Sequence, residues 1–114
     1  MEALYDRTGR VYAWLHETEK IYGLNGANLA FIADDSVYAW NGTHVGWWQD
    51  GHIRDRSGSV ALFTADAESL GVARPARSAR PAAPARSASP ARPARSARPA
   101  RPAKRTSWAV AMPF

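Results

Sequence analysis

The chain has 114 residues, 15 basic and 10 acidic side chains, a net charge of +5 and no cysteine. This length suits one small domain, and the lack of cysteine excludes disulfides and thiolate chemistry. No apolar run of about 18 residues predicts a transmembrane helix, and the polar start "MEALYDRTGR" does not resemble a secretory signal. We therefore expect a cytoplasmic protein, which could still contact a membrane surface from outside.

Charge divides the chain into two parts. Through Gly71 there are five basic and ten acidic residues, a net charge of −5; from Val72 onward there are ten basic residues and no acid. Such asymmetry predicts a folded body and a separate basic tail. We place the body at residues 1–66, the basic tail at 67–105 and an aromatic C-terminal segment at 106–114.

The body contains four similar twelve-residue units. They are "LYDRTGRVYAWL" (4–15), "IYGLNGANLAFI" (21–32), "VYAWNGTHVGWW" (37–48) and "IRDRSGSVALFT" (53–64). Each unit begins with an aliphatic residue and has an aromatic residue at its eleventh place. Each also has a glycine at its sixth place, and these glycines are Gly9, Gly26, Gly42 and Gly58. A short period of this kind indicates one supersecondary unit used repeatedly.

Each unit predicts a β-hairpin, because segments rich in β-branched and aromatic residues flank the glycine. Asn25-Gly26 and Asn41-Gly42 are the preferred central pair of a type I′ turn, in which both residues have positive φ. Thr8-Gly9 and Ser57-Gly58 are weaker versions of the same pair, for which a turn with a bulge is the alternative. The short polar connectors "HETEK", "ADDS" and "QDGH" join the hairpins, so we expect eight strands and no helix in the body.

Pairing across a two-residue turn would place the second, fourth, seventh, ninth and eleventh residues of each unit on one face. That face is aromatic, and the opposite face carries the aliphatic first and mostly small tenth residues. Four hairpins around an approximate fourfold axis would remove most free edges. We place the small-residue face at the axis, which leaves the aromatic face in need of another cover. The candidate aromatic contact residues are Trp14, Phe31, Trp47, Phe63 and, in the tail, Trp108.

Three stretches resemble the fourfold β-flower domain, a family of small bacterial all-β proteins. They are "LYDRTGRVYAWL", "VYAWNGTHVGWWQDGHIRDRSG" and the basic, proline-containing tail that ends in "SWAVAMPF". The resemblance covers nearly the whole chain and is most specific in "GTHVGWWQDGHIRD". It implies a shallow barrel of four hairpins and a distant likeness to tubby-like barrels, some of which bind phosphoinositides. It implies no catalytic residues.

The tail repeats every three residues, eleven times, from Ala73 to Arg105. The first place is alanine, the second is mostly arginine, and the third is mostly proline or serine. Seven prolines exclude a continuous α-helix. A three-residue period matches polyproline II, which would gather the arginines on one face and extend the tail over roughly 100 Å.

Three interpretations of the tail remain open. It is a solvated, disordered segment, an arm that binds phosphates of nucleic acid or acidic lipid, or a strap that folds back on the acidic body. In the third case the aromatic C-terminal segment would dock on the apolar face of the sheet. The candidate anion-binding residues are Arg74, Arg77, Arg80, Arg92, Arg95, Arg98 and Arg101.

One cluster of polar residues is a candidate for metal binding or acid–base chemistry: His44, Asp50, His52 and Asp55. The two histidines are eight residues apart, which matches no specific metal motif. Asp55 shares its place in the unit with Asp6, so a role in a turn is simpler. We predict no catalytic residue, metal ligand, cofactor or small-molecule substrate.

These observations favour a non-enzymatic β-flower module that binds an anionic partner, nucleic acid or acidic lipid, through its basic tail. A structural alternative is a self-assembling protein whose tail folds back on the barrel, within one chain or between copies. A third alternative is a small metal-dependent hydrolase built around His44 and His52.

Overall fold

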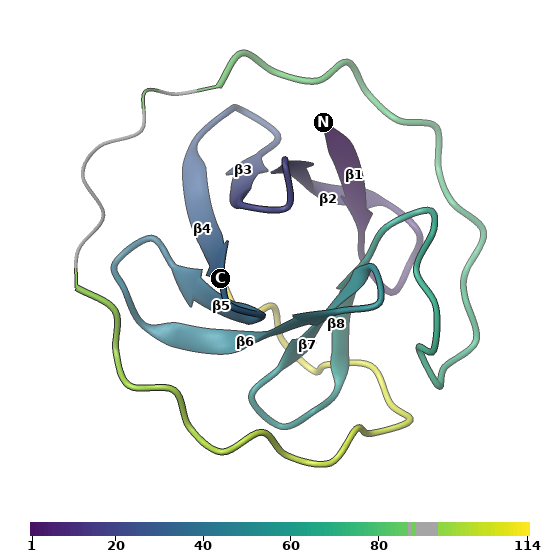
Figure 1. The fold of residues 1–114 in the computed structure, drawn as a ribbon. Helices are drawn as coiled ribbons and strands as arrows, with labels where there is room; N and C mark the ends of the chain where they lie inside the picture. The colour runs from purple at the N-terminus through teal and green to yellow at the C-terminus, as the bar shows by residue number, and fades with distance from the viewer. Residues whose placement is uncertain (87, 89–93) are drawn as a thin grey trace.

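Eight antiparallel strands close into one barrel in the computed structural model, which describes residues 1–86, 88 and 94–114 (Figure 1). The strands are β1 (Glu2–Tyr5), β2 (Val11–His16), β3 (Lys20–Gly23), β4 (Asn28–Ala33), β5 (Ser36–Ala39), β6 (His44–Gln49), β7 (His52–Asp55) and β8 (Val60–Phe63). They follow one another around the barrel in chain order. Within the described ranges no helix is long and apolar enough to cross a membrane. The all-β prediction of four hairpins is confirmed.

Consecutive strand pairs form four hairpins, which we call petals 1 to 4: β1–β2, β3–β4, β5–β6 and β7–β8. Their tips point outward in Figure 1, and the molecule is a flat disc of 37 × 36 × 21 Å. This shape agrees with the shallow barrel expected from the repeated unit. A disc has two faces and a rim, and the petal tips lie at the rim.

The petal tips are three-residue loops. In petal 2, the Gly23 N–H donates to the Ala27 carbonyl at 2.9 Å, and the Gly26 N–H donates to the Gly23 carbonyl at 3.0 Å. The Asn25 side chain accepts from the Ala27 N–H at 3.0 Å, and Gly26 has a φ of 85°. The same backbone bonds recur in the other three petals. A loop of this kind needs positive φ at its glycine only.

The predicted type I′ turns at Asn25-Gly26 and Asn41-Gly42 are therefore wrong, although the glycines do lie at the strand reversals. Positive φ at both central residues occurs instead in the connectors between petals. The three pairs are Glu17-Thr18, Asp34-Asp35 and Asp50-Gly51, with φ between 48° and 78°. The physical reason is that an Asn or Asp side chain at each tip bonds an N–H two residues on, which stabilises the longer loop.

A β-bulge in every petal changes which residues face the interior. In petal 1, Leu4 pairs with Ala13 but Tyr5 pairs with Val11, so Tyr12 is skipped. The other petals show the same shift at the same place. A bulge turns the extra residue away from its expected face. The ninth residues of the units, predicted on the aromatic face, pack with the interior instead: Tyr12, Leu29, Val45 and Ala61.

The barrel interior holds the small-residue face, as predicted. The aliphatic first residues of the four units, Leu4, Ile21, Val37 and Ile53, are fully buried there. The C-terminal segment completes this core. Ala109, Met112 and Phe114 pack against it, and the Tyr12 hydroxyl donates to the Phe114 carbonyl at 3.0 Å.

Gly46 sits where the other units carry a larger residue, and a Cβ added there would overlap the Arg54 carbonyl oxygen on the neighbouring strand. Gly46→Ala should destabilise the fold by about 1–3 kcal/mol, because the two backbones must separate. Gly23→Ala is the matched control, since its added Cβ meets only side chains, the nearest at 3.2 Å. Urea denaturation of both variants measures the difference. Equal stability of the two variants would contradict the close approach.

Candidate functional site

The chain leaves the barrel beside the last connector. The Thr64 N–H donates to the Gly51 carbonyl at 2.9 Å, and the Glu68 N–H donates to the Asp50 carbonyl at 2.8 Å. We call residues 73–105 the strap, and its described residues, 73–86, 88 and 94–105, lie around the outside of the petals (Figure 1). The described part of the strap contains no helix or strand.

The strap docks on the glycine carbonyls of the petal tips. The Ser78 N–H donates to Gly9 at 2.8 Å, the Ser96 N–H donates to Gly42 at 2.8 Å, and the Arg105 N–H donates to Gly58 at 3.0 Å. At petal 2, the Ala85 carbonyl lies so close to Gly26 that an added Cβ would overlap it. The strap therefore approaches all four tips. The four turn glycines named from the sequence provide the contact surface.

A nine-residue period in the strap matches the four petals. In the three-residue repeat of the strap, the third residue is proline except at residues 78, 87, 96 and 105. Three of these residues are the donors just described, and Ser87 lies outside the described residues. Proline has no N–H and cannot donate to a tip carbonyl, which explains its absence at these places. The three-residue repeat alone does not predict this longer period, which is visible in the sequence as recurring "ARS".

Arginines of the strap cover aromatic rings of the petals. The guanidinium of Arg77 lies 5.7 Å from the Tyr5 ring centroid, and that of Arg95 lies 5.6 Å from the Tyr38 ring centroid. Arg101 lies 5.7 Å from the Trp47 ring centroid. Contacts of this kind contribute about 0.5–1 kcal/mol each at exposed sites. They supply part of the cover that the aromatic face required.

The candidate aromatic contact residues do not form a free surface. Trp14, Phe31, Trp47 and Phe63 are all buried. Trp108 is half-buried, and its ring centroid lies 5.8 Å from that of Phe63. These rings form a layer between the barrel and the segments that cover it, so a partner could reach them only if the cover moved.

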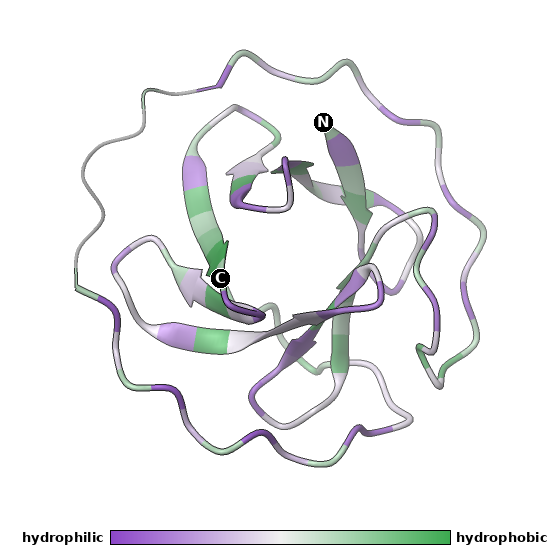
Figure 2. Cartoon of the chain, in the orientation of Figure 1, coloured by the Kyte–Doolittle hydropathy of each residue, from purple (hydrophilic) through white to green (hydrophobic). Residues whose placement is uncertain are grey.

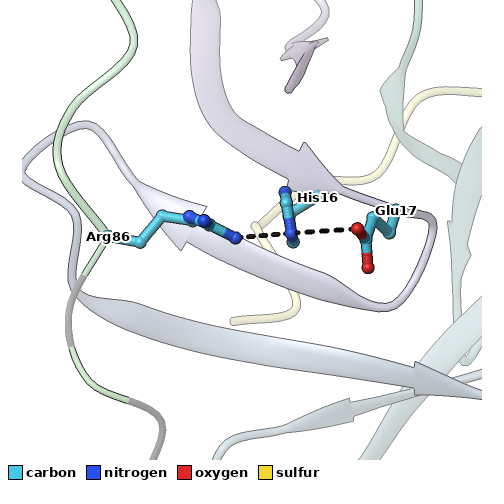
Figure 3. Close-up of polar contacts among 3 residues, drawn as sticks. All are labelled: His16, Glu17 and Arg86. Atoms are coloured by element: carbon cyan, nitrogen blue, oxygen red, sulfur yellow. Dashed lines mark hydrogen bonds and ion pairs between the residues drawn. The ribbon is translucent and has the colours of Figure 1, made fainter.

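Petal 1 also holds the strap through a side chain. His16 ends β2, and its Nε2 atom receives the Arg86 guanidinium (Figure 3). The carboxylate of Glu17 lies on the other side, with Oε1 3.6 Å from the same nitrogen. The imidazole therefore ties the strap to the end of β2.

The candidate anion-binding arginines fall into two groups. Arg77, Arg95 and Arg101 stack on rings but remain exposed, and the three others in the described residues are exposed without such a stacking contact: Arg74, Arg80 and Arg98. Arg92 lies outside the described residues. Hydrophilic colour recurs along the strap in Figure 2, which follows the triplet. The structure brings these arginines to one rim, around the disc.

Petal 4 differs from the others because Arg54 replaces the tyrosine, and Arg54 is only 3% exposed. Its guanidinium donates to the carbonyls of Gly58 at 2.6 Å, Arg105 at 2.8 Å and Leu70 at 2.9 Å. It thereby ties together the petal tip, the strap and the segment before the strap. Burial lowers the pKa of Arg54 and the charge of Asp50 opposes this, but a guanidinium remains protonated in proteins.

His52 accepts a hydrogen bond from Arg54, and this requires a neutral imidazole. The Arg54 Nε–H donates to His52 Nε2 at 3.2 Å, so that nitrogen carries a lone pair. His52 Nδ1 faces the Asp50 carbonyl at 3.4 Å and carries the proton. Burial lowers the pKa of His52; Arg54 and Lys104 lower it further, while Asp50 raises it through its backbone and its charge.

His44 has a separate environment on petal 3. Its ring packs edge-on against Tyr38 and Trp47, and its Nε2 lies 3.3 Å from Ser36 Oγ. Its backbone N–H donates to the Ser96 hydroxyl at 2.7 Å. The structure therefore does not bring the two histidines into one site.

The carboxylates of the predicted cluster are also dispersed. Asp55 Oδ1 accepts N–H bonds from Ser57 at 2.9 Å and Ser59 at 3.1 Å, which is the turn role expected for it. Asp50 lies in the connector after β6. Within the described ranges no group of three or more His, Asp or Glu residues could hold a metal ion. The hydrolase alternative has no assembled site in this part of the chain.

Comparison with known proteins gives one match. A family model described as "4-fold beta flower protein" matches residues 2–112 of the 114-residue chain. No curated protein and no solved structure matches it.

Gly9→Ala should release the strap from petal 1. Gly9 and Gly71 both have positive φ, 84° and 75°, so alanine at either position costs about 1–2 kcal/mol. Only at Gly9 would the new Cβ also overlap a strap carbonyl, that of Ala76. We expect Gly9→Ala to lose more stability than Gly71→Ala and to speed trypsin cleavage at strap arginines. Equal cleavage rates in the two variants would argue against docking at this tip.

Stability should fall as the pH drops below about 6.5, the ordinary pKa of the imidazole. Because the pKa of His52 is lowered in the folded state, the unfolded chain binds a proton that the folded chain excludes, and the free energy of unfolding declines with pH. Urea denaturation from pH 8 to 5 measures this decline. His52→Gln should flatten part of it, the remainder arising from His44, whose pKa burial also lowers. An unchanged slope in His52→Gln would show that the buried contact with Arg54 does not exclude the proton.

Proposed function

The chain belongs to the 4-fold beta flower family, and from that premise we propose that it is a non-enzymatic module that binds a polyanion along its strap. The family is of unknown function and is not known as enzymatic. One observation carries the proposal: a tail with ten basic residues docks at the petal tips. This docking holds exposed guanidinium groups at one rim.

Docking favours binding because it removes part of the ordering cost. A disordered basic tail loses conformational freedom when it binds, whereas a strap already tied to the petals has lost much of it beforehand. Arg77 and Arg95 are further held over Tyr5 and Tyr38. Guanidinium groups in fixed positions then bind phosphates with two N–H donors each.

The charge of the body directs a polyanion to the rim. Most acidic residues lie in or beside the connectors, away from the petal tips, and repel phosphates from that side of the disc. The exposed acids there are Glu2, Glu17, Glu19, Asp34, Asp35, Asp50, Asp66 and Glu68. A negative body and a positive rim therefore leave the strap as the favourable contact.

A single strand of nucleic acid fits this rim better than a bilayer or a duplex. A flat membrane would meet only part of a strap that encircles the disc (Figure 1). The exposed large apolar side chains of the described residues are Met1, Leu24 and Val110, which lie in three separate segments. Duplex DNA is stiff over about 50 nm, far more than the 37 Å width of the disc. A flexible single strand can follow the curve.

The test is fluorescence anisotropy of a labelled 20-nucleotide single strand with the full chain at several salt concentrations. Arg74→Gln/Arg98→Gln removes two rim charges, and the slope of log affinity against log salt should fall by roughly 1.4, about 0.7 per phosphate contact. Arg7→Gln/Arg10→Gln is the matched control, because it removes the same charge from the tip of petal 1 and leaves the strap arginines in place, so it should change the slope less.

Equal losses in the two double variants would mean that net charge alone drives binding, and the proposal that the strap holds the polyanion would be wrong. Vesicles containing phosphatidylserine form the second arm. Tighter binding to vesicles than to the single strand, at equal salt, would overturn the choice of nucleic acid.

A further inference from the structure

The fourth seam of the barrel is open where the other three are closed. We use "seam" for the border between neighbouring petals. The seams β2–β3, β4–β5 and β6–β7 each pair four residues and end in a connector of three, two and two residues, respectively. The seam β8–β1 pairs only Tyr5 with Phe63. The reason is that the chain after β8 runs along the Asp50-Gly51 connector toward the strap and does not extend the pairing with β1.

Two adjoining cavities lie at this open seam. One of about 410 Å³ is lined by Tyr5, Ala65, Arg77, Ser78, Ala79 and Arg80. The other, of about 160 Å³, shares Tyr5, Ala65 and Arg80 and is completed by Glu2, Ala3 and Asp66. We call the two together the seam cleft. Its volume falls in the range of small-ligand sites, roughly 300–1,000 Å³.

The two parts of the seam cleft carry opposite charges. Arg77 and Arg80 line the larger cavity, and the stacking of Arg77 on Tyr5 holds its guanidinium in place. Glu2 and Asp66 line the smaller cavity together with Arg80, so acidic side chains outnumber basic ones there. Paired guanidinium groups bind phosphate, and carboxylates accept hydrogen bonds from the amino group of a base such as cytosine. Both cavities are part of one cleft, so a single ligand can use both.

We propose that the seam cleft binds one nucleotide with an amino-bearing base, the terminal residue of a bound strand. Its phosphate contacts Arg77 and Arg80, and its base amino group points toward Glu2 and Asp66. This inference rests on the proposed function. It adds a base-specific subsite to a rim that otherwise recognises its ligand by charge alone. The subsite exists once per molecule because only one seam is open.

The strap provides its own control. Arg80 follows the Ser78 dock by two residues, and Arg98 follows the Ser96 dock by two residues. The two arginines therefore have the same place relative to petals 1 and 3. The seam beside petal 3 is closed by four residue pairs and the Asp34-Asp35 turn. Loss of either charge lowers the net charge equally, but only Arg80 lines the seam cleft.

The experiment is isothermal titration of the full chain with cytidine monophosphate at low salt. We expect saturable one-to-one binding, weakened at least about fivefold by Arg80→Gln and much less by Arg98→Gln, which removes the same charge outside the seam cleft. Uridine monophosphate lacks the amino group and should bind more weakly, and Asp66→Asn should reduce that preference. Cytidine and inorganic phosphate, titrated separately, should each bind more weakly than the nucleotide. Arg80 is exposed, so thermal melting should show an unchanged fold.

Several results would overturn the inference: no binding of the nucleotide, equal weakening by Arg80→Gln and Arg98→Gln, or binding no tighter than that of phosphate alone. The single-strand titration distinguishes failure of the seam-cleft inference from failure of the proposed function. A strand that binds with the expected salt slope, while the nucleotide does not bind, rejects the seam cleft and keeps the proposed function. If the nucleotide binds but strand binding does not depend on the strap arginines, the proposed function is rejected and nucleotide binding in the seam cleft is kept.

Discussion

The glycine carbonyls at the tips of petals 1, 3 and 4 are the constraint on which the outer half of this molecule depends. A hairpin barrel of this size has two apolar faces, and closing the barrel buries only one of them. The strap covers part of the other by donating N–H groups to Gly9, Gly42 and Gly58. Because the tips recur around an approximate fourfold axis, one repeated contact suffices for the whole rim. The tail sequence therefore carries a period that the barrel imposes.

Departures from the fourfold pattern concentrate at the fourth petal and its seam with the first. There Arg54 replaces a tyrosine, donates to three carbonyls from separate segments and requires a neutral His52. The chain also leaves the barrel there, after β8, and the seam is open beside Tyr5. A regular repeat can build the scaffold, but a site that occurs once needs the symmetry to fail in one place. We regard the open seam and the buried Arg54 as two results of the same exit of the chain.

Much of the fold was predictable because the unit repeats. A glycine at the sixth place and an aromatic at the eleventh, four times over, indicated four hairpins and the small-residue interior. The wrong turn type at Asn25-Gly26 arose because the Asn-Gly pair suits two loops, and the side-chain bond to the Ala27 N–H decides between them. That choice shifted the register, so Tyr12 was assigned to the wrong face. The arginines were found from composition, but their separation into stacked and free groups was not.

The sequence by itself determined the repeated hairpin, the opposite charges of body and tail, and the exclusion of a helical tail, since these follow from local propensity, charge and the missing N–H of proline. Only the tertiary structure decided which residue of each unit bulges inward, that the tail docks on petal tips, and that Arg77 and Arg80 share a cleft with Glu2 and Asp66. These features depend on contacts between residues distant in the chain. No local pattern specifies such contacts, because they arise from the closure of the barrel.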